Sequence, residues 1–458
     1  FPGQGSQHVD MGATAAVRHP ELRAALDAAD EHFRAAGRGP LSRRMFPPPA
    51  YDDERRRDQG EALRATEWAQ PAIGAMSVGL LHTLAGFGVS PAAVAGHSYG
   101  ELVALYAAGA LPLDGLLTAS RVRGELMSAS DTDRGTMAAL SGDLDAIEAL
   151  LEGHPEVVLA NRNHPAQGVV AGPRAAVASV VAAAGQAGID AQELPVAAAF
   201  HSALVADAVA PFREALGQIT VTEPTLPVVA CATAAPYPAD ADAVRDQLAA
   251  QITTPVDWVG VVRRLADDGV QLFVEVGPKG ILGGLTAKTL GAEVEVVSLD
   301  RRGPKEHGDV QLKRALARLA AAGVPVDPGP LLAERPPADP LVAGSKATVW
   351  LGGANHKNPE TLEPPMPDLP DLPDLHGVSA ASSAEAPSWA DLPKGTAPMA
   401  KPVHLERSVD ERAGLGATGL PPAPAARAAT GAPAVAAGDL AALLASTRDT
   451  LAAFQAAK

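Results

Sequence analysis

The pattern of apolar and polar positions changes several times along the chain. Up to about residue 300, short apolar runs alternate with segments of helical periodicity, which is typical of an α/β domain. The apolar runs predict strands at residues 92–96, 226–231, 272–276 and 293–298. The periodic segments predict helices at residues 66–85, 101–108 and 114–128. We therefore expect one α/β core, formed by residues 1–129 and 197–300.

Residues 130–196 have a separate pattern of predicted strands and helices within this core. The segments TMAALSG, VVLANRN, QGVVAGP and AQELPV are predicted strands, and DLDAIEALL and RAAVASVVAAAGQAG are predicted helices. Their order is βαββαβ, the split pattern of a ferredoxin-like fold. The sequence therefore predicts a ferredoxin-like subdomain inserted into the larger α/β domain.

After residue 300 the regular alternation of predicted strands and helices ends. Residues 301–358 contain a basic amphipathic helix, VQLKRALARLAAAG, and a short strand-like piece, ATVWLGG. Residues 359–437 are rich in Pro, Ala, Gly and Ser and cannot bury enough apolar surface to fold, so we expect a disordered, semi-extended linker. Residues 438–458 regain helical periodicity, with Asp439 as the expected N-cap of an amphipathic helix.

Composition and charge narrow the class of partner. Of the 458 residues, 47% are hydrophobic and 20% are charged, which is ordinary for a globular protein. The net charge of −16 argues against a nucleic-acid or anionic-membrane surface and favours small anions or another protein as partners. No segment is long and apolar enough to span a membrane, and no signal peptide is visible. We therefore expect a cytoplasmic protein without membrane contact.

The single cysteine and the first residues carry two further expectations. Cys231 is the only cysteine, which excludes an internal disulfide framework and a Cys-based zinc site. It lies in the apolar run VVACATA, so we expect it to be buried. The chain opens directly in the turn-like segment FPGQGSQ, and we expect a strand to run into this turn, as in a piece of a longer polypeptide.

Residues 96–100, with the sequence GHSYG, are the strongest candidate for chemistry. A predicted strand ends at Gly96 and a predicted helix begins just after Gly100, so the pattern is strand, tight turn, helix, and we call residues 96–100 the elbow. Ser98 would lie at the helix N-terminus, where free N–H groups favour the oxyanion of an attacked thioester. The alternative is a serine that merely caps the helix within a glycine-rich turn.

A serine hydroxyl needs a base to act as a nucleophile. His201 lies in AAAFHSAL, just after the last strand of the insert, at a junction from which it could reach the elbow. The alternative is a histidine whose polar atoms are simply satisfied. His97 neighbours the serine, and we expect it to shape the elbow or its pocket.

The order of the motifs resembles a known family. The motifs are FPGQGSQ at 1–7, AQPA at 69–72, GHSYGE at 96–101, RVRGELM at 121–127, NRNHPAQGVVAG at 161–172, AFHS at 199–202, TPVDW at 254–258 and EVGP at 275–278. They resemble those of malonyl-CoA:acyl carrier protein transacylases and of the acyltransferase domains of polyketide and fatty-acid synthases. The resemblance covers about residues 1 to 300 and implies an α/β-hydrolase-like core with a ferredoxin-like insert.

The resemblance implies a role for each residue of the reacting centre. Ser98 would carry the acyl group as an ester, and His201 would be its general base. The backbone carbonyl of Gln251, and not a carboxylate, would orient the histidine. Gln4 and the backbone N–H of Tyr99 would form the oxyanion hole, with a turn-stabilising amide as the alternative for Gln4.

The resemblance also implies a substrate-binding arginine. Arg123 matches the family's arginine for the free carboxylate of a malonyl group, which a planar guanidinium holds with two parallel hydrogen bonds. A buried pair of this kind would reject neutral acyl groups. The alternative is an arginine on a helix surface, a role for which Arg121 is also a candidate. Asn161 and Asn163 resemble residues at the mouth of the pocket.

Two positions bear on the choice of acyl unit. Phe200 resembles the signature of malonyl-selective domains, because a bulky ring narrows the space beside the α-carbon and disfavours a methyl group. The match is partial, because Ala198 stands at the first signature position, where the family has a histidine. Tyr99 is larger than the usual residue and resembles iterative systems such as polyunsaturated-fatty-acid and enediyne synthases.

The sequence therefore predicts an acyltransferase that moves malonyl from coenzyme A to Ser98 and then to the phosphopantetheine of an acyl carrier protein or domain. No metal and no cofactor bound by this domain are expected, and a ketosynthase domain is the expected neighbour. Docking of an acidic carrier would need a local basic patch, for which Arg162 and the arginines around Arg263 are candidates. The alternatives are a thioester hydrolase with the same Ser–His chemistry and a non-catalytic docking segment of a megasynthase.

Overall fold

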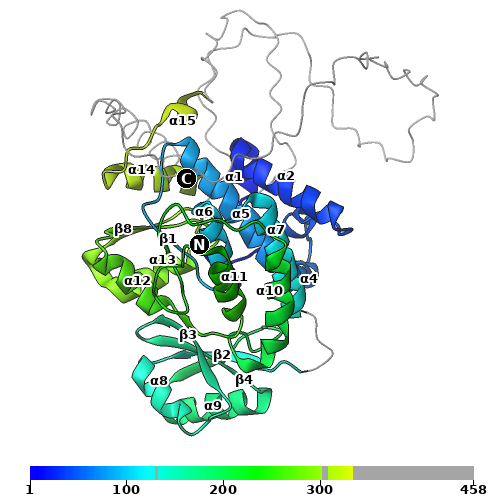
Figure 1. Cartoon of the computed structure of the whole chain (residues 1–458), viewed down its shortest axis with the longest axis vertical. Coiled ribbons are helices and arrows are strands. Elements are labelled where there is room, and N and C mark those ends of the chain that lie inside the picture. The colour runs from blue at the N-terminus through cyan, green and yellow to red at the C-terminus, as the bar shows by residue number, and fades with distance from the viewer. Residues whose placement is uncertain (129–132, 302–307, 334–458) are drawn as a thin grey trace, which may run out of the picture. The chain divides into compact units, whose positions relative to one another are not determined.

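The computed structural model describes residues 1–333, apart from 129–132 and 302–307. Within these residues, helices surround short parallel strands, and a separate sheet carries two helices of its own (Figure 1). The predicted strand ATVWLGG, the predicted linker and the predicted terminal helix of residues 438–458 lie outside the described residues. None of the described helices is both long and apolar enough to cross a membrane.

The helices before the insert are α1 (Ala13–Arg18), α2 (Pro20–Ala35), α3 (Ser42–Met45), α4 (Asp53–Arg64), α5 (Thr66–Gly86), α6 (Gly100–Ala107) and α7 (Leu113–Ser128). The α-helices after the insert are α10 (Val209–Gly217), α11 (Ala241–Ala250), α12 (Trp258–Asp267), α13 (Ile281–Leu290), α14 (Gly308–Ala321) and α15 (Gly329–Ala333). Two short 3₁₀ helices span Ala203–Ala208 and Gly291–Glu293. The three helices predicted before the insert are confirmed as α5, α6 and α7, and the basic amphipathic helix is confirmed as α14.

The strands of the core are parallel and shorter than predicted. Strand β1 (Val94–Ala95) pairs with β6 (Val228–Val229), and β8 (Leu272–Glu275) pairs with β9 (Glu295–Ser298). The predicted strand 226–231 is too long at both ends, because Pro227 has no N–H to donate and the chain turns back after β6, where Ala230 pairs with Ala235. Cys231 is fully buried, as predicted.

Helix α5 forms the centre of the core. Every residue from Ala69 to Thr83 is buried, and α2 and α7 pack against it. A helix that is apolar around its whole circumference needs such cover on all sides. Gly79 permits the close approach of α2, because a Cβ there would come within 2.2 Å of the Leu22 side chain. This packing fixes α7, and with it Arg123, relative to the elbow.

The insert has its own sheet and its own apolar core. It contains β2 (Thr136–Ser141), α8 (Leu144–Leu151), β3 (Val158–His164), β4 (Gln167–Gly172), α9 (Arg174–Gln186) and β5 (Asp190–Glu193), in the predicted βαββαβ order. The strand order is β5-β2-β4-β3-β7, antiparallel except for the pair of β3 with β7 (Val256–Asp257). Because β7 belongs to the core, this parallel pair, in which Asn161 lies opposite Val256, ties the insert to the core.

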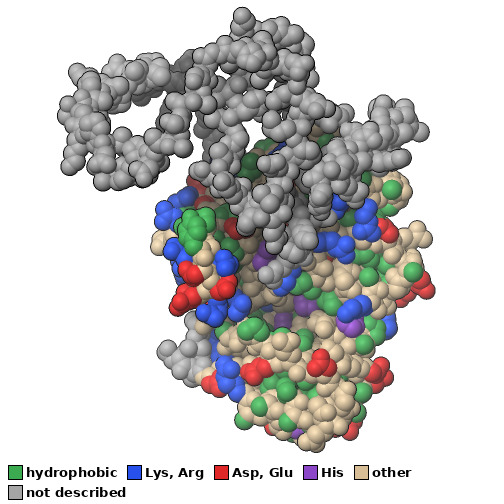
Figure 2. Space-filling view, turned by 180° about the vertical axis from the view of Figure 1, so that it is seen from behind, with side chains coloured by type: hydrophobic (Ala, Val, Ile, Leu, Met, Phe, Trp, Pro, Cys, Tyr) green, Lys and Arg blue, Asp and Glu red, His purple; other side chains and the backbone are tan. Residues whose placement is uncertain are grey.

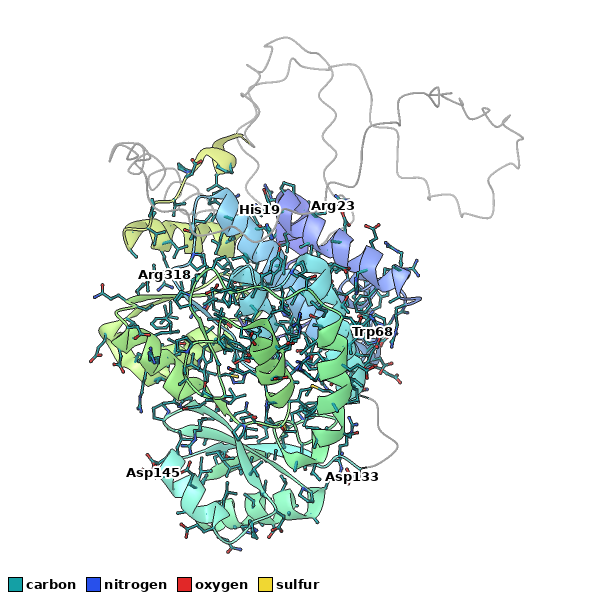
Figure 3. All side chains as sticks on the ribbon, in the orientation of Figure 1. His19, Arg23, Trp68, Asp133, Asp145 and Arg318 are labelled. Atoms are coloured by element: carbon teal, nitrogen blue, oxygen red, sulfur yellow. The ribbon has the colours of Figure 1, made fainter. Side chains whose placement is uncertain are left out.

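Helix α14 is fastened to the core at both ends by polar contacts. The His19 ring lies 3.1 Å from the Asp309 carboxylate at its first turn, and Arg318 pairs with Glu295 at its last turn (Figure 3). His19 and Asp309 are both buried, so this pair is shielded from solvent. The segment after residue 300 is therefore an integral part of the described fold as far as α14.

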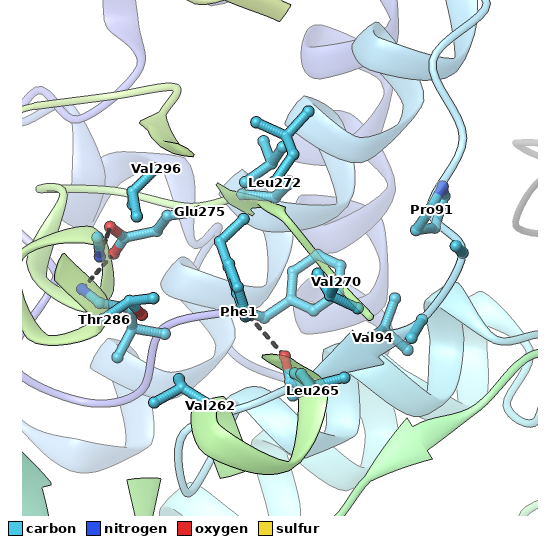
Figure 4. Close-up of a pocket in the computed structure, with 18 of the residues that line it drawn as sticks. Phe1, Pro91, Val94, Val262, Leu265, Val270, Leu272, Glu275, Thr286 and Val296 are labelled. Atoms are coloured by element: carbon cyan, nitrogen blue, oxygen red, sulfur yellow. Dashed lines mark hydrogen bonds between the residues drawn. The ribbon is translucent and has the colours of Figure 1, made fainter. Parts of the chain in front are cut away.

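An apolar groove of about 310 Å³ lies between β1 and β8 (Figure 4). Phe1 lines it, and its amino group donates to the Ala95 carbonyl at 2.8 Å while its own carbonyl accepts from the His97 N–H at 3.0 Å. These two bonds are the pattern of a parallel ladder. The pairing places the following turn, which contains Gln4, directly beside the elbow.

Candidate active site

The elbow has the geometry that its glycines predict. Ser98 has a φ of 51°, a left-handed conformation that is uncommon for a residue with a side chain. A Cβ at Gly96 would come within 2.0 Å of the Gly100 backbone, and one at Gly100 within 2.1 Å of the Phe1 carbonyl. Both positions therefore require glycine. Strain of this kind at a turn is a feature of functional sites.

Ser98 and His201 meet although 103 residues separate them in the sequence. The Ser98 Oγ lies 2.8 Å from His201 Nε2, and the other ring nitrogen, Nδ1, faces the backbone carbonyls of Gln251 at 3.1 Å and Thr254 at 2.9 Å. Carbonyl oxygens only accept, so Nδ1 carries the proton and Nε2 is left as the acceptor for the serine hydroxyl. This is the tautomer that a general base requires.

Burial keeps this histidine neutral. His201 is 3% exposed, and its burial, with the nearby charge of Arg123 as a second cause, lowers its pKa to about 3. The ring is therefore neutral at neutral pH and can accept a proton. His201 also has a φ of 60°, so its backbone is left-handed like that of Ser98.

Arg123 reaches the serine from the interior of α7. It is 2% exposed, and its NH2 group lies 3.4 Å from Ser98 Oγ and 3.0 Å from Gln251 Oε1. Burial lowers its pKa to about 10, which still leaves it charged at neutral pH. Among the residues that the structure describes, no carboxylate forms an ion pair with it. The alternative of a surface arginine is wrong for Arg123, whereas Arg121 pairs with Glu125 on the partly exposed side of the same helix.

Gln4 and Tyr99 flank the elbow, but their side chains point elsewhere. The Gln4 amide donates to Thr66 Oγ1 at 3.1 Å and accepts from Gln70 Nε2 at 3.3 Å. The Tyr99 ring is buried, with its hydroxyl 2.8 Å from Ser120 Oγ, and Tyr99 itself is the N-cap of α6. Only the backbone N–H groups of these two residues are therefore candidates for an oxyanion hole.

Residues of the insert and of α12 contact His97 on the other side of the elbow. His97 Nε2 lies 3.1 Å from Asn163 Oδ1, and Asn163 Nδ2 donates to Gln167 Oε1 at 3.3 Å. The His97 ring also packs against Trp258, with 5.7 Å between ring centroids. Burial lowers the pKa of His97 to about 4, so it is neutral too. Asn161 is buried on β3 opposite Val256, and Phe200 is buried next to His201.

Several residues of the site were not singled out from the sequence. Thr254 shares the orientation of His201 with Gln251, and Glu101 and Tyr237 form a buried pair behind the elbow, with 2.6 Å between Tyr237 Oη and Glu101 Oε2. Glu101 lies within the GHSYGE motif, so its position in the motif was the available signal. Thr254 likewise opens the TPVDW motif, whereas Tyr237 lies in none of the motifs and its contact with Glu101 depends on the fold.

The apolar groove of Figure 4 is a different place from this site. Neither Ser98 nor His201 lines this groove. A second, smaller cavity of about 160 Å³ lies beside Gln4 and is lined by residues of the segments 61–66 and 195–197. Among the described residues, no group of three or more His, Cys, Asp or Glu side chains is placed to hold a metal ion.

Comparisons with known proteins identify the family that this chain is similar to. Residues 1–326 match the acyl transferase domain family. The chain is 30% identical over 335 residues to one component of the polyunsaturated fatty acid synthase of Thraustochytrium sp., covering 71% of this chain but 12% of that protein. It is 33% identical over 295 residues to a malonyl CoA-acyl carrier protein transacylase of Bacillus subtilis, covering 63% of this chain and 88% of the relative.

A solved structure gives the same result. The acyltransferase domain from the second module of the salinomycin polyketide synthase superposes with a TM-score of 0.64 at 30% identity, covering 72% of this chain and 75% of that one. The similarity confirms both the α/β fold and the resemblance that the sequence motifs carry. The chain therefore belongs to the acyl transferase family of enzymes.

Proposed function

We propose that this chain transfers a malonyl unit from coenzyme A, through an ester on Ser98, to the phosphopantetheine thiol of an acyl carrier protein or domain, for polyketide or fatty-acid chain extension. One observation carries the malonyl assignment: a charged, buried Arg123 lies 3.4 Å from Ser98 Oγ with no described carboxylate to pair with. The name of the Bacillus subtilis relative supports the same substrate and carrier.

In the first half-reaction, Ser98 Oγ attacks the thioester carbon of malonyl-CoA while His201 Nε2 takes the hydroxyl proton. The carbonyl oxygen becomes an oxyanion, which the backbone N–H groups of Tyr99 and Gln4 would stabilise. The C–S bond then breaks, the coenzyme A thiolate takes the proton back from His201, and the malonyl ester remains on Ser98. The 2.8 Å contact of Ser98 with His201 supports this proton path.

The second half-reaction runs the same chemistry in reverse. His201 removes the proton from the carrier thiol as its sulfur attacks the Ser98 ester, and the collapsing intermediate returns that proton to Ser98 Oγ. The carbonyls of Gln251 and Thr254 hold the ring in one tautomer throughout, so the same nitrogen serves both steps. No net proton is consumed.

Arg123 would bind the malonyl carboxylate with its guanidinium. A buried arginine forms its strongest contacts with a planar carboxylate, and a neutral acyl group would leave it without that partner. This proposal makes Arg123 the source of selectivity for carboxylated acyl units. Asn161, Asn163 and His97 would line the pocket mouth.

Phe200 would disfavour a methyl substituent on the α-carbon. The proposal predicts that Phe200→Ser raises labelling by methylmalonyl-CoA relative to malonyl-CoA by about tenfold, since one methyl group is worth only a modest discrimination. Competition between the two thioesters, read by intact-mass spectrometry, measures the ratio. An unchanged ratio contradicts the assignment of Phe200. Tyr99 supports an iterative synthase, as does the relative from Thraustochytrium sp..

The finer architecture belongs to the same proposal. The order β5-β2-β4-β3 with two helices supports a ferredoxin-like insert at residues 130–196, within an α/β-hydrolase-like core at residues 1–129 and 197–300. We also propose a neighbouring ketosynthase domain. On the face seen in Figure 2, basic and acidic side chains are interspersed. Of the candidate docking arginines, Arg162 pairs with Glu148 and Arg264 pairs with Asp268, so a carrier would have to compete with these pairs.

The experiment that tests this function uses malonyl-CoA with a holo acyl carrier protein and, as control, its apo form. Mass spectrometry of the carrier is expected to show a malonyl adduct on the holo form only. Release of free coenzyme A without an adduct on the holo carrier would favour a thioester hydrolase. Neither release nor adduct, with folded protein, would favour a non-catalytic docking segment.

A further inference from the structure

A buried carboxylate lies directly behind the elbow, and the mechanism above does not use it. Glu101 is in the first turn of α6 and is 1% exposed. Its Oε1 accepts from the Cys231 backbone N–H, and its Oε2 accepts from Tyr237 Oη at 2.6 Å and from Gln251 Nε2 at 2.7 Å. Burial raises its pKa, but all three partners donate and therefore favour the ionised form.

The Gln251 side chain connects this carboxylate to the reacting centre. Its Nε2 donates to Glu101 Oε2 and, at 2.6 Å, to the Ser98 carbonyl, while its Oε1 accepts from Arg123 at 3.0 Å. The two closest acceptors of Nε2 are oxygens that cannot donate, so the amide has only one orientation that satisfies its neighbours. In that orientation its oxygen faces the guanidinium.

We propose that Glu101 is a positioning residue, which acts through the Gln251 side chain to aim Arg123 at the acyl pocket and so sets the selectivity for carboxylated acyl units. The inference rests on the proposed function, because it assumes that Arg123 binds the carboxylate of the acyl group. It goes beyond that function by giving the Gln251 side chain and Glu101 a part in selectivity.

Charge gives a second reason for this arrangement. The negative charge of Glu101 is among the causes that raise the pKa of Arg123 against the effect of burial. The Gln251 side chain lies between Glu101 and Arg123. Glu101 therefore offsets the charge of the guanidinium without forming an ion pair with it, and leaves the guanidinium N–H groups that would bind the substrate carboxylate unoccupied by Glu101. A carboxylate in direct contact with Arg123 would compete with the substrate for the same donors.

Replacing Glu101 by glutamine is expected to disrupt the hydrogen bond between position 101 and Gln251. An amide at position 101 must turn its oxygen to the Cys231 N–H, which leaves its NH₂ group facing Gln251 Nε2. Two donors then face each other. If the Gln251 amide turns over to accept, its oxygen faces the Ser98 carbonyl, so the bond to that carbonyl is lost as well. The Gln251 NH₂ group then faces Arg123, which loses its acceptor and its orientation.

The test measures Ser98 acylation by malonyl-CoA and by acetyl-CoA, which has no carboxylate, in wild type and in Glu101→Gln. Malonyl labelling is expected to fall at least about tenfold, the effect of one misdirected hydrogen bond to a charged group, and acetyl labelling by less than about threefold. The malonyl-to-acetyl ratio therefore falls. A residue with only a structural role would lower both rates together.

Tyr237→Phe is the matched control, because it also removes one hydrogen bond from Glu101 but leaves the bond to Gln251. Its ratio is expected to stay at the wild-type value, with a similar loss of thermal stability. Gln251→Leu removes the amide and keeps the backbone carbonyl that faces His201, and it is expected to lower the ratio as Glu101→Gln does. It decides the question if Glu101→Gln fails to fold.

A double-mutant cycle tests whether Glu101 acts through Gln251. If it does, the double variant has the same ratio as Gln251→Leu alone, because the link is already broken. A wild-type ratio in folded Glu101→Gln or in Gln251→Leu, or effects that multiply in the double variant, would overturn the inference while wild type still forms the malonyl ester. Wild type that forms no malonyl ester would instead remove the proposed function, and the inference with it.

Discussion

The core side and the insert side of the site hold their polar groups in different ways. On the core side, Arg123 and Glu101 are almost fully buried and are linked through Gln251 to the Ser98 backbone. On the insert side, Asn163 is only partly buried and bonds neutral partners, His97 and Gln167. Bonds to buried charges contribute more than neutral bonds near solvent. We therefore expect the core side to decide rate and selectivity, and the insert side to adjust them.

Among substitutions that leave the nucleophile in place, the largest effect is expected from His201→Ala, on the core side. Loss of a general base lowers the rate by about 10² to 10⁴-fold, and Ser98 acylation by malonyl-CoA measures it. His164→Ala is the matched control, because His164 is also a buried histidine but lies at the end of β3. Equal losses in the two variants would contradict the role of His201.

The next effect is expected from Arg123→Ala. Loss of a charge-assisted pair with the substrate lowers malonyl labelling by about 100-fold, whereas labelling by acetyl-CoA changes little. Arg121→Ala, on the same helix, is expected to leave both rates near the wild-type value. Equal falls for the two thioesters in Arg123→Ala would show that the arginine does not read the carboxylate.

A smaller effect is expected on the insert side. Asn163→Ala removes the partner of His97 Nε2, and the loss of one neutral hydrogen bond corresponds to about 1 kcal/mol, or roughly fivefold in rate. Acylation rates with malonyl-CoA measure it. A loss as large as that in Arg123→Ala would break the distinction between the two sides.

The smallest effect is expected from pH. The lowered pKa values of His201 and His97, about 3 and about 4, keep both rings neutral above about pH 5. The base form is lost only as pH falls through the lowered value, so Ser98 acylation is expected to change by less than about twofold between about pH 5 and 8. A fall in the acylation rate near the ordinary histidine pKa of about 6.5 would mean that His201 is more exposed to solvent than the structure indicates.

How much the sequence could predict depended on how local each signal was. The elbow was predictable because strand, glycines and helix are contiguous, and the βαββαβ order of the insert was predictable because its periods alternate in a short segment. Glu101 could be placed on its helix, but not opposite Tyr237, which lies 136 residues away. The point at which β6 begins, just after Pro227, and the direction of the Gln4 side chain depend on tertiary contacts in the same way.

The most direct test is intact-mass spectrometry after brief incubation with malonyl-CoA, for wild type, Ser98→Ala and Arg123→Ala. The account predicts a malonyl adduct on wild type, none on Ser98→Ala and a weak one on Arg123→Ala. An adduct that persists in Ser98→Ala, or folded wild type that takes up no malonyl group, would contradict it.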